Sequence, residues 1–291
     1  RESIYCYLII GLRDYVNKNK FPGVVIGISG GIDSAFSTCV ATDALGPDRV
    51  KGILMPSKFT SSESNEDANE LGENLGIELK SISIEEIVKA YDSTLDPLFK
   101  DSKKDITEEN IQSRARGSLL MAYSNKFGHM VLTNGNKSEV SVGYSTLYGD
   151  MCGGFSVVKD LYKSELYKLA EWRNNHVPST SVLNKKSLIP QNILTKEPTA
   201  ELKPNQMDKD TLPPYEELDK ILYLLVERES SISEIVDLGF EVDVVTKVQN
   251  MLYNSEYKRR QAAPGVKISE RNFGYDRRYP ITNAFRDSKG S

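Results

Sequence analysis

The stretch Val24-Val25-Ile26-Gly27-Ile28-Ser29-Gly30-Gly31-Ile32-Asp33-Ser34 decides the fold. Its first five residues form a short apolar, β-branched run, which is typical of a strand buried on both faces of a parallel sheet. A helical pattern over residues 35–44 follows at once. Glycines let backbone amides approach phosphate oxygens closely, and the N-terminus of a helix favours negative charge. The stretch therefore predicts a pyrophosphate-binding turn between a strand and a helix.

The side chains of this turn refine the prediction. Ser29 and Ser34 supply hydroxyl donors, and Gly30 and Gly31 leave room for the backbone amides to surround a phosphate. Asp33 would repel a bare polyphosphate, so we expect Mg²⁺ between its carboxylate and the nucleotide. The chain contains neither GxxxxGK[ST] nor GxGxxG, which excludes a Walker loop and a Rossmann fingerprint. The alternative is a purely structural turn whose residues cap the following helix.

The rest of the first half alternates between strand and helix patterns. Further strands are predicted at 50–55, 79–84 and 129–133, and Pro56 ends the first of them. Helices are predicted from Ile4 to Val16, after a cap at Ser62, and from Glu108 to about Phe127 after a cap at Thr107. Repeated βαβ units predict an α/β fold with a doubly wound parallel sheet flanked by helices. Ligands of such folds bind at the carboxyl ends of the strands.

The second half of the chain changes character at Pro178. Residues 178–213 are rich in polar residues and proline, so we expect a long active-site loop without regular elements, a disordered segment being the alternative. A small helical C-terminal part is predicted over about 214–260, with helices after Pro214, at 233–238 and at 242–253. We assign residues 1–285 to one domain and 286–291 to a tail.

Composition excludes several classes of protein. The chain has 291 residues, 39% of them apolar, and a formal net charge of −4, which argues against general nucleic-acid binding. No run approaches the roughly 18 apolar residues of a membrane span, and the first residues lack the features of a signal peptide. Three cysteines and two histidines favour a reducing compartment, with the cytoplasm as the expected location, and give little material for a zinc site.

Further motifs downstream carry a family resemblance. They are TEENIQSRARG at 107–117, TNGNKSE at 133–139, YGD at 148–150, KEPTAEL at 196–202 and YKRRQ at 257–261. Together with SGGIDS at 29–34, they make the chain resemble the NAD synthetases, members of the N-type ATP pyrophosphatases with an adenine nucleotide alpha hydrolase-like fold. The resemblance covers most of residues 1–285.

The resemblance implies a ligase that forms a carbon–nitrogen bond. Such an enzyme uses ATP and Mg²⁺ to adenylate the nicotinate carboxylate of nicotinic acid adenine dinucleotide with release of pyrophosphate, and ammonia then displaces AMP to give NAD. A carboxylate is a poor acceptor for an amine, and adenylation supplies the leaving group, so no protein nucleophile is required.

The resemblance also implies roles for individual residues. Glu139 becomes the second magnesium ligand beside Asp33, although an isolated Glu at such a position is more often a solvated helix residue. Lys163 and Thr199 are expected to contact the ATP phosphates and, with Asp33, to act in catalysis; the alternative for Lys163 is an exposed helix lysine. Met55, at the end of a strand, is assigned to the ATP site. Lys196 and Lys203 would let the long loop close cationic groups over the site.

The dinucleotide site is predicted from the remaining motifs. Asn110 and Arg114 lie four residues apart on one helical face, whereas Arg116 is expected to face elsewhere. The full predicted set for the dinucleotide is Asn110, Arg114, Thr133, Asp150, Lys258 and Arg259. For Lys258 and Arg259 the alternative is a solvated basic helix end that the helix dipole favours.

Other families share the SGGxDS turn. GMP, asparagine and argininosuccinate synthetases and tRNA-modifying enzymes adenylate their substrates with it, so GMP synthetase or another amidating ligase stays an alternative, as does a non-catalytic nucleotide-binding homologue. Residues 256–261 and 276–283 are closest to the synthetase domain of glutamine-dependent NAD synthetases, which carry a nitrilase-like amidase domain. We therefore expect a truncated or separately expressed domain that uses free ammonia, and a homodimer or higher oligomer with residues 108–127 in its interface.

Overall fold

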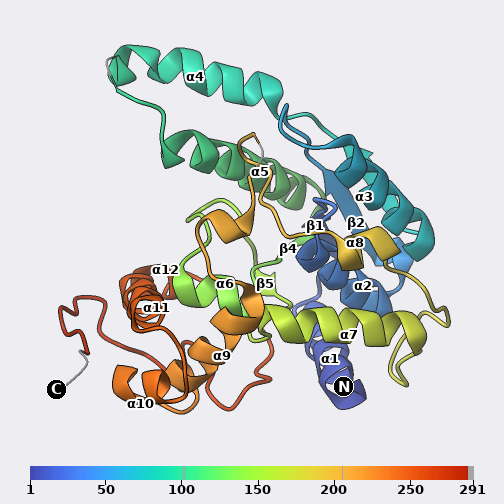
Figure 1. Cartoon of the computed structure of the whole chain (residues 1–291). Helices are drawn as coiled ribbons and strands as arrows, with labels where there is room; N and C mark the ends of the chain where they lie inside the picture. Colours follow the sequence, from blue (N-terminus) through green and yellow to red (C-terminus); the bar gives the residue numbers. More distant parts are fainter. Residues whose placement is uncertain (101, 205, 288–291) are drawn as a thin grey trace.

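A five-stranded parallel sheet forms the centre of the computed structural model, which describes residues 1–100, 102–204 and 206–287 (Figure 1). Its strands are β1 (Val24–Gly27), β2 (Val50–Leu54), β3 (Glu78–Ser81), β4 (Met130–Thr133) and β5 (Phe155–Ser156). Their order is β3-β2-β1-β4-β5, and each neighbouring pair is parallel. The chain starts in the middle strand and winds outward in both directions, which confirms the predicted doubly wound sheet.

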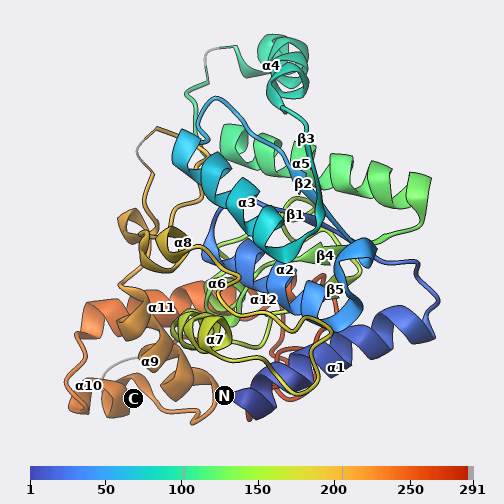
Figure 2. The same ribbon diagram turned by 90° about the vertical axis from the view of Figure 1, so that its right-hand side faces the viewer.

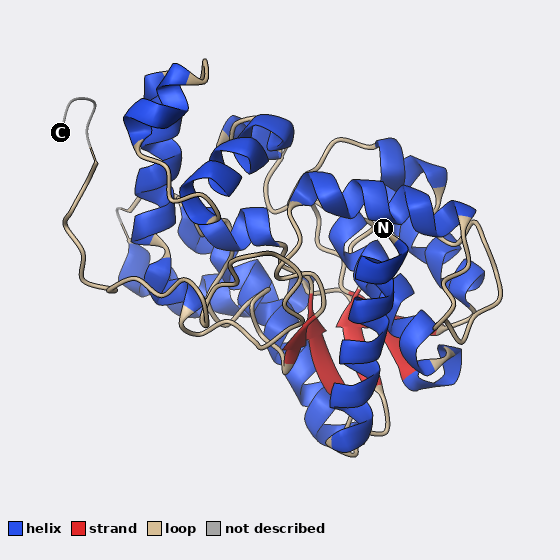
Figure 3. Ribbon diagram, turned by 90° about the horizontal axis from the view of Figure 1, so that it is seen from below, coloured by secondary structure: helices blue, strands red, loops and turns tan. Residues whose placement is uncertain are grey.

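Helices surround this sheet and account for most of the regular structure (Figure 3). They are α1 (Glu2–Lys18), α2 (Ile32–Leu45), α3 (Ser62–Leu75), α4 (Glu85–Phe99), α5 (Ile106–Phe127), α6 (Lys137–Val142), α7 (Lys163–Asn175), α8 (Gln191–Thr195), α9 (Tyr215–Val226), α10 (Ile232–Asp237), α11 (Val242–Asn254) and α12 (Glu256–Arg259). Short 3-10 helices lie at Pro47–Arg49 and Asp208–Asp210.

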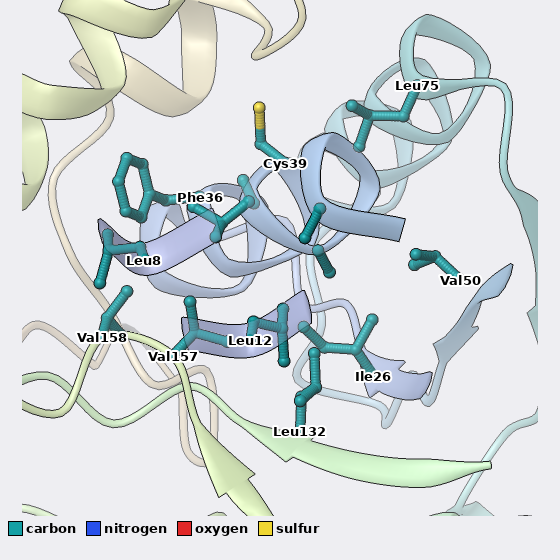
Figure 4. Close-up of a cluster of buried hydrophobic side chains, with 14 of the residues drawn as sticks. Leu8, Leu12, Ile26, Phe36, Cys39, Val50, Leu75, Leu132, Val157 and Val158 are labelled. Atoms are coloured by element: carbon teal, nitrogen blue, oxygen red, sulfur yellow. The ribbon is translucent and has the colours of Figure 1, made fainter. Parts of the chain in front are cut away.

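The apolar strand β1 is buried on both faces, as its sequence predicts. Val24 and Ile26 pack into the larger core cluster, which α1, α2, α3 and α7 complete, whereas Val25 points into a second cluster with Leu120 of α5. Figure 4 shows Ile26 beside Leu132 of the neighbouring strand, with Leu12 of α1 close by. Successive residues of a strand face opposite sides, so a strand covered by helices on both faces must be apolar throughout.

The helical C-terminal part has an apolar core of its own. Leu218 and Leu222 of α9 pack with Val245 and Leu252 of α11, and all four side chains are fully buried. In Figures 1 and 2 this part lies to one side of the sheet, against α6 and α7. The prediction of a helical part over about 214–260 is thus confirmed.

Several predicted boundaries are wrong, each for a local reason. The strand predicted at 79–84 spans Glu78–Ser81, and α4 follows without having been predicted, although its apolar residues Ile87, Tyr91, Leu95 and Leu98 recur at helical spacing. Asp105, not Thr107, caps α5: its carboxylate accepts the Thr107 amide at 2.8 Å and forms a capping box with Glu108. Likewise Ser61 rather than Ser62 caps α3.

The loop predicted at 178–213 contains regular structure, contrary to expectation. α8 and the 3-10 helix Asp208–Asp210 interrupt it, and Ile193 anchors α8 in the large core. The first two residues of the predicted tail also have partners: Arg286 Nη2 donates to Asn254 Oδ1 at 2.7 Å, and Asp287 accepts the Ile232 amide at 2.7 Å. Residues 288–291 lie outside the described part. Within the described ranges, no helix is long and apolar enough to cross a membrane.

A buried carboxylate joins α1, α2, α7 and the loop after α7. Asp43 of α2 accepts hydrogen bonds from Arg173 Nε at 2.7 Å, from the Tyr5 hydroxyl at 2.8 Å and from Ser181 Oγ at 2.6 Å. The Asp43 and Arg173 side chains are both 0% exposed. Removing one member of a buried ion pair leaves the other charged and without compensation.

We therefore expect Asp43→Ala to lower the free energy of unfolding by about 3–5 kcal/mol. Asp14→Ala is the control, because Asp14 pairs with Lys18 at 2.7 Å on the exposed side of α1 and its loss should cost less than about 0.5 kcal/mol. Urea unfolding followed by circular dichroism measures both. Similar midpoints for the two variants would contradict the structural role of Asp43.

Candidate active site

A cavity of about 320 Å³ opens at the carboxyl ends of β1, β2 and β4. This is where a doubly wound sheet binds its ligands. The walls come from the turn after β1, from α5, from the starts of α6 and α7, and from the segment 196–202. The predicted site residues that line it are Ser29, Gly31, Asp33, Ser34, Met55, Thr133, Glu139, Asp150, Lys163 and Thr199.

The glycine turn, residues 29–34, is held by internal hydrogen bonds at the N-terminus of α2. Ser34 Oγ donates to the Gly31 carbonyl at 3.0 Å and accepts the Ser29 amide at 3.2 Å. Gly30 has a φ of +78°, and a Cβ atom there would lie 2.3 Å from the Ser64 carbonyl oxygen of α3. Only glycine fits this conformation and this close contact. No side chain caps α2 at Gly31, so the first amides of the helix stay available to an anion.

A lysine and two carboxylates meet beside this turn. Lys163 Nζ contacts Asp33 Oδ2 and lies 3.2 Å from Glu139 Oε1. The Lys163 side chain is 3% exposed and that of Glu139 is 16% exposed, so neither is the solvated helix residue of the alternative interpretation. Asn136 Nδ2 donates to Asp33 Oδ1 at 2.8 Å, and Asn136 and Glu139 form the capping box of α6.

The charges of this cluster depend on one another. Burial raises the pKa of Glu139, Lys163 opposes this rise, and the nearby carboxylates Asp33 and Asp208 add to it. Burial by itself lowers the pKa of Lys163, but Asp33 and Glu139 outweigh burial and hold that pKa above its ordinary value. The lysine therefore keeps its positive charge, and the site as a whole carries an excess of carboxylates around it.

The residues present fit a magnesium ion that is shared with a nucleotide. The Asp33 and Glu139 carboxylates converge on one cation, the Lys163 ammonium. Mg²⁺ is commonly bound by one or two carboxylates together with phosphate oxygens and water. Among the described residues no group of three or more His, Cys, Asp or Glu side chains can hold a metal on its own. Mg²⁺ held here by Asp33 and Glu139 would complete its coordination with oxygens of ATP.

The segment 196–202 covers the cavity in a defined position. Lys196 Nζ donates to Asp67 Oδ2 and to Ser64 Oγ, both at 3.0 Å. Glu201, with a φ of +49°, accepts the hydroxyls of Ser61 and Ser64 at 2.9 and 2.8 Å. The segment is thus fixed to the start of α3. Of the two lysines predicted to close over the site, Lys196 lines the cavity.

Lys203 lies farther out. It pairs with Glu109 of α5 at 3.4 Å, and its side chain is half exposed.

Five predicted residues stand outside the cavity lining in the described part of the chain: Gly30, Asn110, Arg114, Lys258 and Arg259. Asn110 Oδ1 accepts the Thr146 hydroxyl at 2.8 Å, and Arg114 Nε donates to the Leu147 carbonyl at 3.1 Å. Both therefore hold the segment before Tyr148-Gly149-Asp150.

Lys258 and Arg259 support the end of α6. Lys258 Nζ donates to the carbonyls of Gly143 and Ser145 at 2.8 and 2.6 Å. Arg259 Nη1 donates to the Ser141 carbonyl at 2.7 Å, and Arg259 Nη2 pairs with Glu256 at 2.9 Å. Cations at a helix C-terminus bind its unpaired carbonyls favourably.

Asn136, Arg116 and Asp208 are among the residues of the site that were not predicted from the sequence. Asn136 was detectable, because Asn followed three residues later by Glu is a capping-box pattern. Arg116 was expected to face elsewhere, yet it lines the cavity and its Nε donates to the Met55 carbonyl at 3.0 Å; burial lowers its pKa to about 10. Asp208 also lines the cavity and accepts the Tyr215 hydroxyl at 2.8 Å. Asp208 lies in the predicted loop, where no motif or apolar periodicity indicates that a side chain reaches the cavity.

Comparison with known proteins decides between the families that share the SGGxDS turn. The family model described as NAD synthase matches residues 4–262. The chain belongs to the NAD synthase family. It is 53% identical over 98% of its length to a glutamine-dependent NAD(+) synthetase of Thermotoga maritima, and 50% identical over 98% to one of Aquifex aeolicus. In each case it covers 48% of the relative, so the chain spans about half the length of the curated relatives it matches.

Solved structures agree with this assignment. A glutamine-dependent NAD+ synthetase from Acinetobacter baumannii in complex with ADP has a TM-score of 0.63 and 44% identity, over 98% of this chain and 50% of that one. An NMN synthetase from Francisella tularensis has a TM-score of 0.71 and 26% identity, over 88% and 94% of the two chains. An NH3-dependent NAD synthetase from Campylobacter jejuni has a TM-score of 0.68 and 27% identity over the same shares.

The glycine turn gives a direct test of the cavity. We expect Gly30→Ala to weaken the binding of Mg²⁺-ATP at least about tenfold, a loss of about 1.4 kcal/mol, because the added Cβ displaces the turn. Gly239→Ala is the matched control: Gly239 has a φ of +96° but open space around it, so it isolates the cost of a positive φ. Titration calorimetry measures both variants. Equal affinities would show that ATP does not use the turn.

Proposed function

We propose that this chain catalyses the ATP-dependent amidation of nicotinic acid adenine dinucleotide to NAD, with release of AMP and pyrophosphate. One observation carries the proposal: Asp33, Glu139 and Lys163 converge beside the SGGIDS turn, in a cavity at the strand ends of a member of the NAD synthase family. ATP is a co-substrate, and Mg²⁺ is the cofactor that the two carboxylates would hold.

The proposed first step forms the mixed anhydride. An oxygen of the nicotinate carboxylate attacks the α-phosphorus of ATP, the bond from that phosphorus to the bridging oxygen breaks, and pyrophosphate leaves. The amides in the first turn of α2 and the hydroxyls of Ser29 and Ser34 hold the departing phosphates. Lys163 places a positive charge beside them, and such a fixed group stabilises negative charge that develops in the transition state. Thr199 is also proposed to contact the phosphates; in this structure its hydroxyl donates to the Gln206 carbonyl. Mg²⁺ supplies further positive charge when bound.

The proposed second step forms the amide. Ammonia attacks the activated carbonyl carbon, AMP leaves with the bridging oxygen, and the nitrogen loses a proton. Water would hydrolyse the same anhydride, so the site has to exclude it. The segment 196–202, bonded to α3 through Lys196 and Glu201, covers the cavity and suits this purpose.

We assign the dinucleotide to Thr133 and Asp150, which line the cavity, and to Asn110 and Arg114, which hold the segment that leads to Asp150. Lys258 and Arg259 are proposed to act there as well, from positions behind α6. Met55, which also lines the cavity, is assigned to ATP.

The nitrogen donor and the assembly are also proposals. Relatives named glutamine-dependent NAD(+) synthetases are about twice as long as this chain, and we propose that it takes ammonia itself and glutamine only with a nitrilase-like amidase domain or partner. A homodimer or higher oligomer that uses α5 and a cytoplasmic location complete the proposal. Cys6, Cys39 and Cys152 are free thiols, in keeping with a reducing compartment.

The decisive experiment mixes the chain with ATP, Mg²⁺ and nicotinic acid adenine dinucleotide. We expect pyrophosphate, AMP and NAD in equal amounts with ammonium chloride, and no NAD with glutamine. Chelation of Mg²⁺ should stop the reaction, and added Mg²⁺ should restore it. A chain that binds ATP without releasing pyrophosphate would be a non-catalytic homologue. Equal turnover with glutamine alone would contradict the proposed nitrogen donor.

The two carboxylates give a further prediction. We expect Asp33→Asn and Glu139→Gln to lower kcat by about 100-fold or more and to raise the Mg²⁺ concentration needed for half-maximal rate, because each removes a negative charge from the proposed metal site. Glu165→Gln is the control, since Glu165 lies exposed in the first turn of α7. Mg²⁺ titrations of pyrophosphate release measure all three variants. An unchanged Mg²⁺ midpoint in both site variants would refute the metal assignment.

A further inference from the structure

The two helices that carry Lys163 and Glu139 are joined at their N-terminal ends by one buried hydroxyl. Ser138 of α6 accepts the backbone amide of Lys163, the first residue of α7, at 2.9 Å through its Oγ. The same Oγ donates to Asp219 Oδ1 of α9 at 2.5 Å. Ser138 is 0% exposed and Asp219 is 5% exposed. The residue before Glu139 thus touches the residue that bears the site lysine.

Asp219 supplies the cap that α7 lacks. The N-cap residue of α7 is Tyr162, whose side chain makes no capping hydrogen bond. A helix start leaves amides without partners, and a carboxylate near them is favoured by hydrogen bonding and by the helix dipole. Asp219 Oδ2 accepts the amide of Ser164, the second residue of α7, at 2.8 Å. The first two amides of α7 are therefore satisfied from α6 and α9.

The first residue of α6 is also hydrogen-bonded to the residue that follows α9. Lys137, the residue before Ser138, is 0% exposed and donates from Nζ to Glu227 Oε1 at 2.6 Å, just after the end of α9. The Tyr162 hydroxyl donates to the other oxygen of Glu227 at 2.8 Å. Two carboxylates, Asp219 in the second turn of α9 and Glu227 just after its last residue, are thus bonded to the beginnings of α6 and α7.

From these contacts we infer that Asp219, acting through Ser138, is a positioning residue that fixes Lys163 relative to Glu139. The inference rests on the proposed function, to which it adds a role for the helical C-terminal part. Asp219 is assigned a positioning role, not a catalytic one, because it does not line the cavity and its hydrogen bonds in the described part of the chain go to Ser138 and Ser164. Its effect on the reaction comes from the placement of the Lys163 backbone, and small displacements of a catalytic group can cost large factors in rate.

The chain offers a matched pair of serines for the test. Ser138 and Ser141 lie on α6, are both fully buried, and differ in one respect: Ser141 Oγ donates to the Lys137 carbonyl within its own helix. We expect Ser138→Ala to lower kcat at least about tenfold with KM for ATP changed less than threefold, whereas Ser141→Ala keeps kcat within about twofold. Asp219→Asn should resemble Ser138→Ala, because an amide cannot accept both hydrogen bonds.

The double variant separates positioning from general loss of structure. If Ser138 and Asp219 act as one unit, kcat of Ser138→Ala/Asp219→Asn equals that of the slower single variant instead of the product of the two effects. Thermal unfolding of every variant confirms that each is folded under assay conditions. A kcat for Ser138→Ala equal to that of Ser141→Ala would overturn the inference, as would multiplicative effects in the double variant.

Amide hydrogen exchange gives a readout that needs no turnover. Ser138→Ala and Asp219→Asn should speed exchange at Lys163 and Ser164, and Ser141→Ala should not. If the unsubstituted chain releases no pyrophosphate, the proposed function fails, and exchange alone then decides whether Asp219 fixes the start of α7. Unchanged exchange at both amides in both variants would refute the contact itself.

Discussion

The ion pair of Lys163 with Asp33 and Glu139 is the constraint on which the rest of this molecule depends. Three charged groups lie close together with little water around them, and such a group is stable only when its partners are held in place. Asp33 comes from the turn after β1, Glu139 from the first turn after β4, and Lys163 from the start of α7. The parallel sheet brings the first two together because its strand ends share one edge.

Lys163 needs a different support, because its helix follows the short edge strand β5. The supports come from the helical C-terminal part, through Asp219 on Ser138 and Ser164, and through Glu227 on Lys137 and Tyr162. Each of these carboxylates is itself buried and fully bonded, so the small helical part is joined to the sheet by directional contacts rather than by apolar packing alone. This explains why the buried face of α9, otherwise apolar, contains the charged residue Asp219.

Patterns of apolar residues made the fold predictable, and motifs made part of the site predictable. The β-branched run before Ser29 identified the central strand, and the alternation after it gave the sheet. α4 was not predicted although Ile87, Tyr91, Leu95 and Leu98 recur at helical spacing, so here the pattern was present in the sequence and was overlooked. In the site, Asp33 and Glu139 follow strands directly, where sequence order implies spatial proximity. Arg116 and Asp208 reach the cavity from a long helix and a long loop, and no local pattern shows which way those side chains point.

The polarity of the site follows from what it has to bind. A polyphosphate carries several negative charges, yet two carboxylates, Asp33 and Glu139, line the cavity. Both form ion pairs with the single ammonium group of Lys163. Under the proposed function, Mg²⁺ held by Asp33 and Glu139 would bring positive charge to these carboxylates, and the Lys163 ammonium would lie beside the phosphates of ATP. Each buried charge would then keep a counter-charge, which would lower the desolvation cost of binding. The two carboxylates would repel a nucleotide that lacks its metal ion, so on this proposal the arrangement of charges would favour the metal-bound nucleotide.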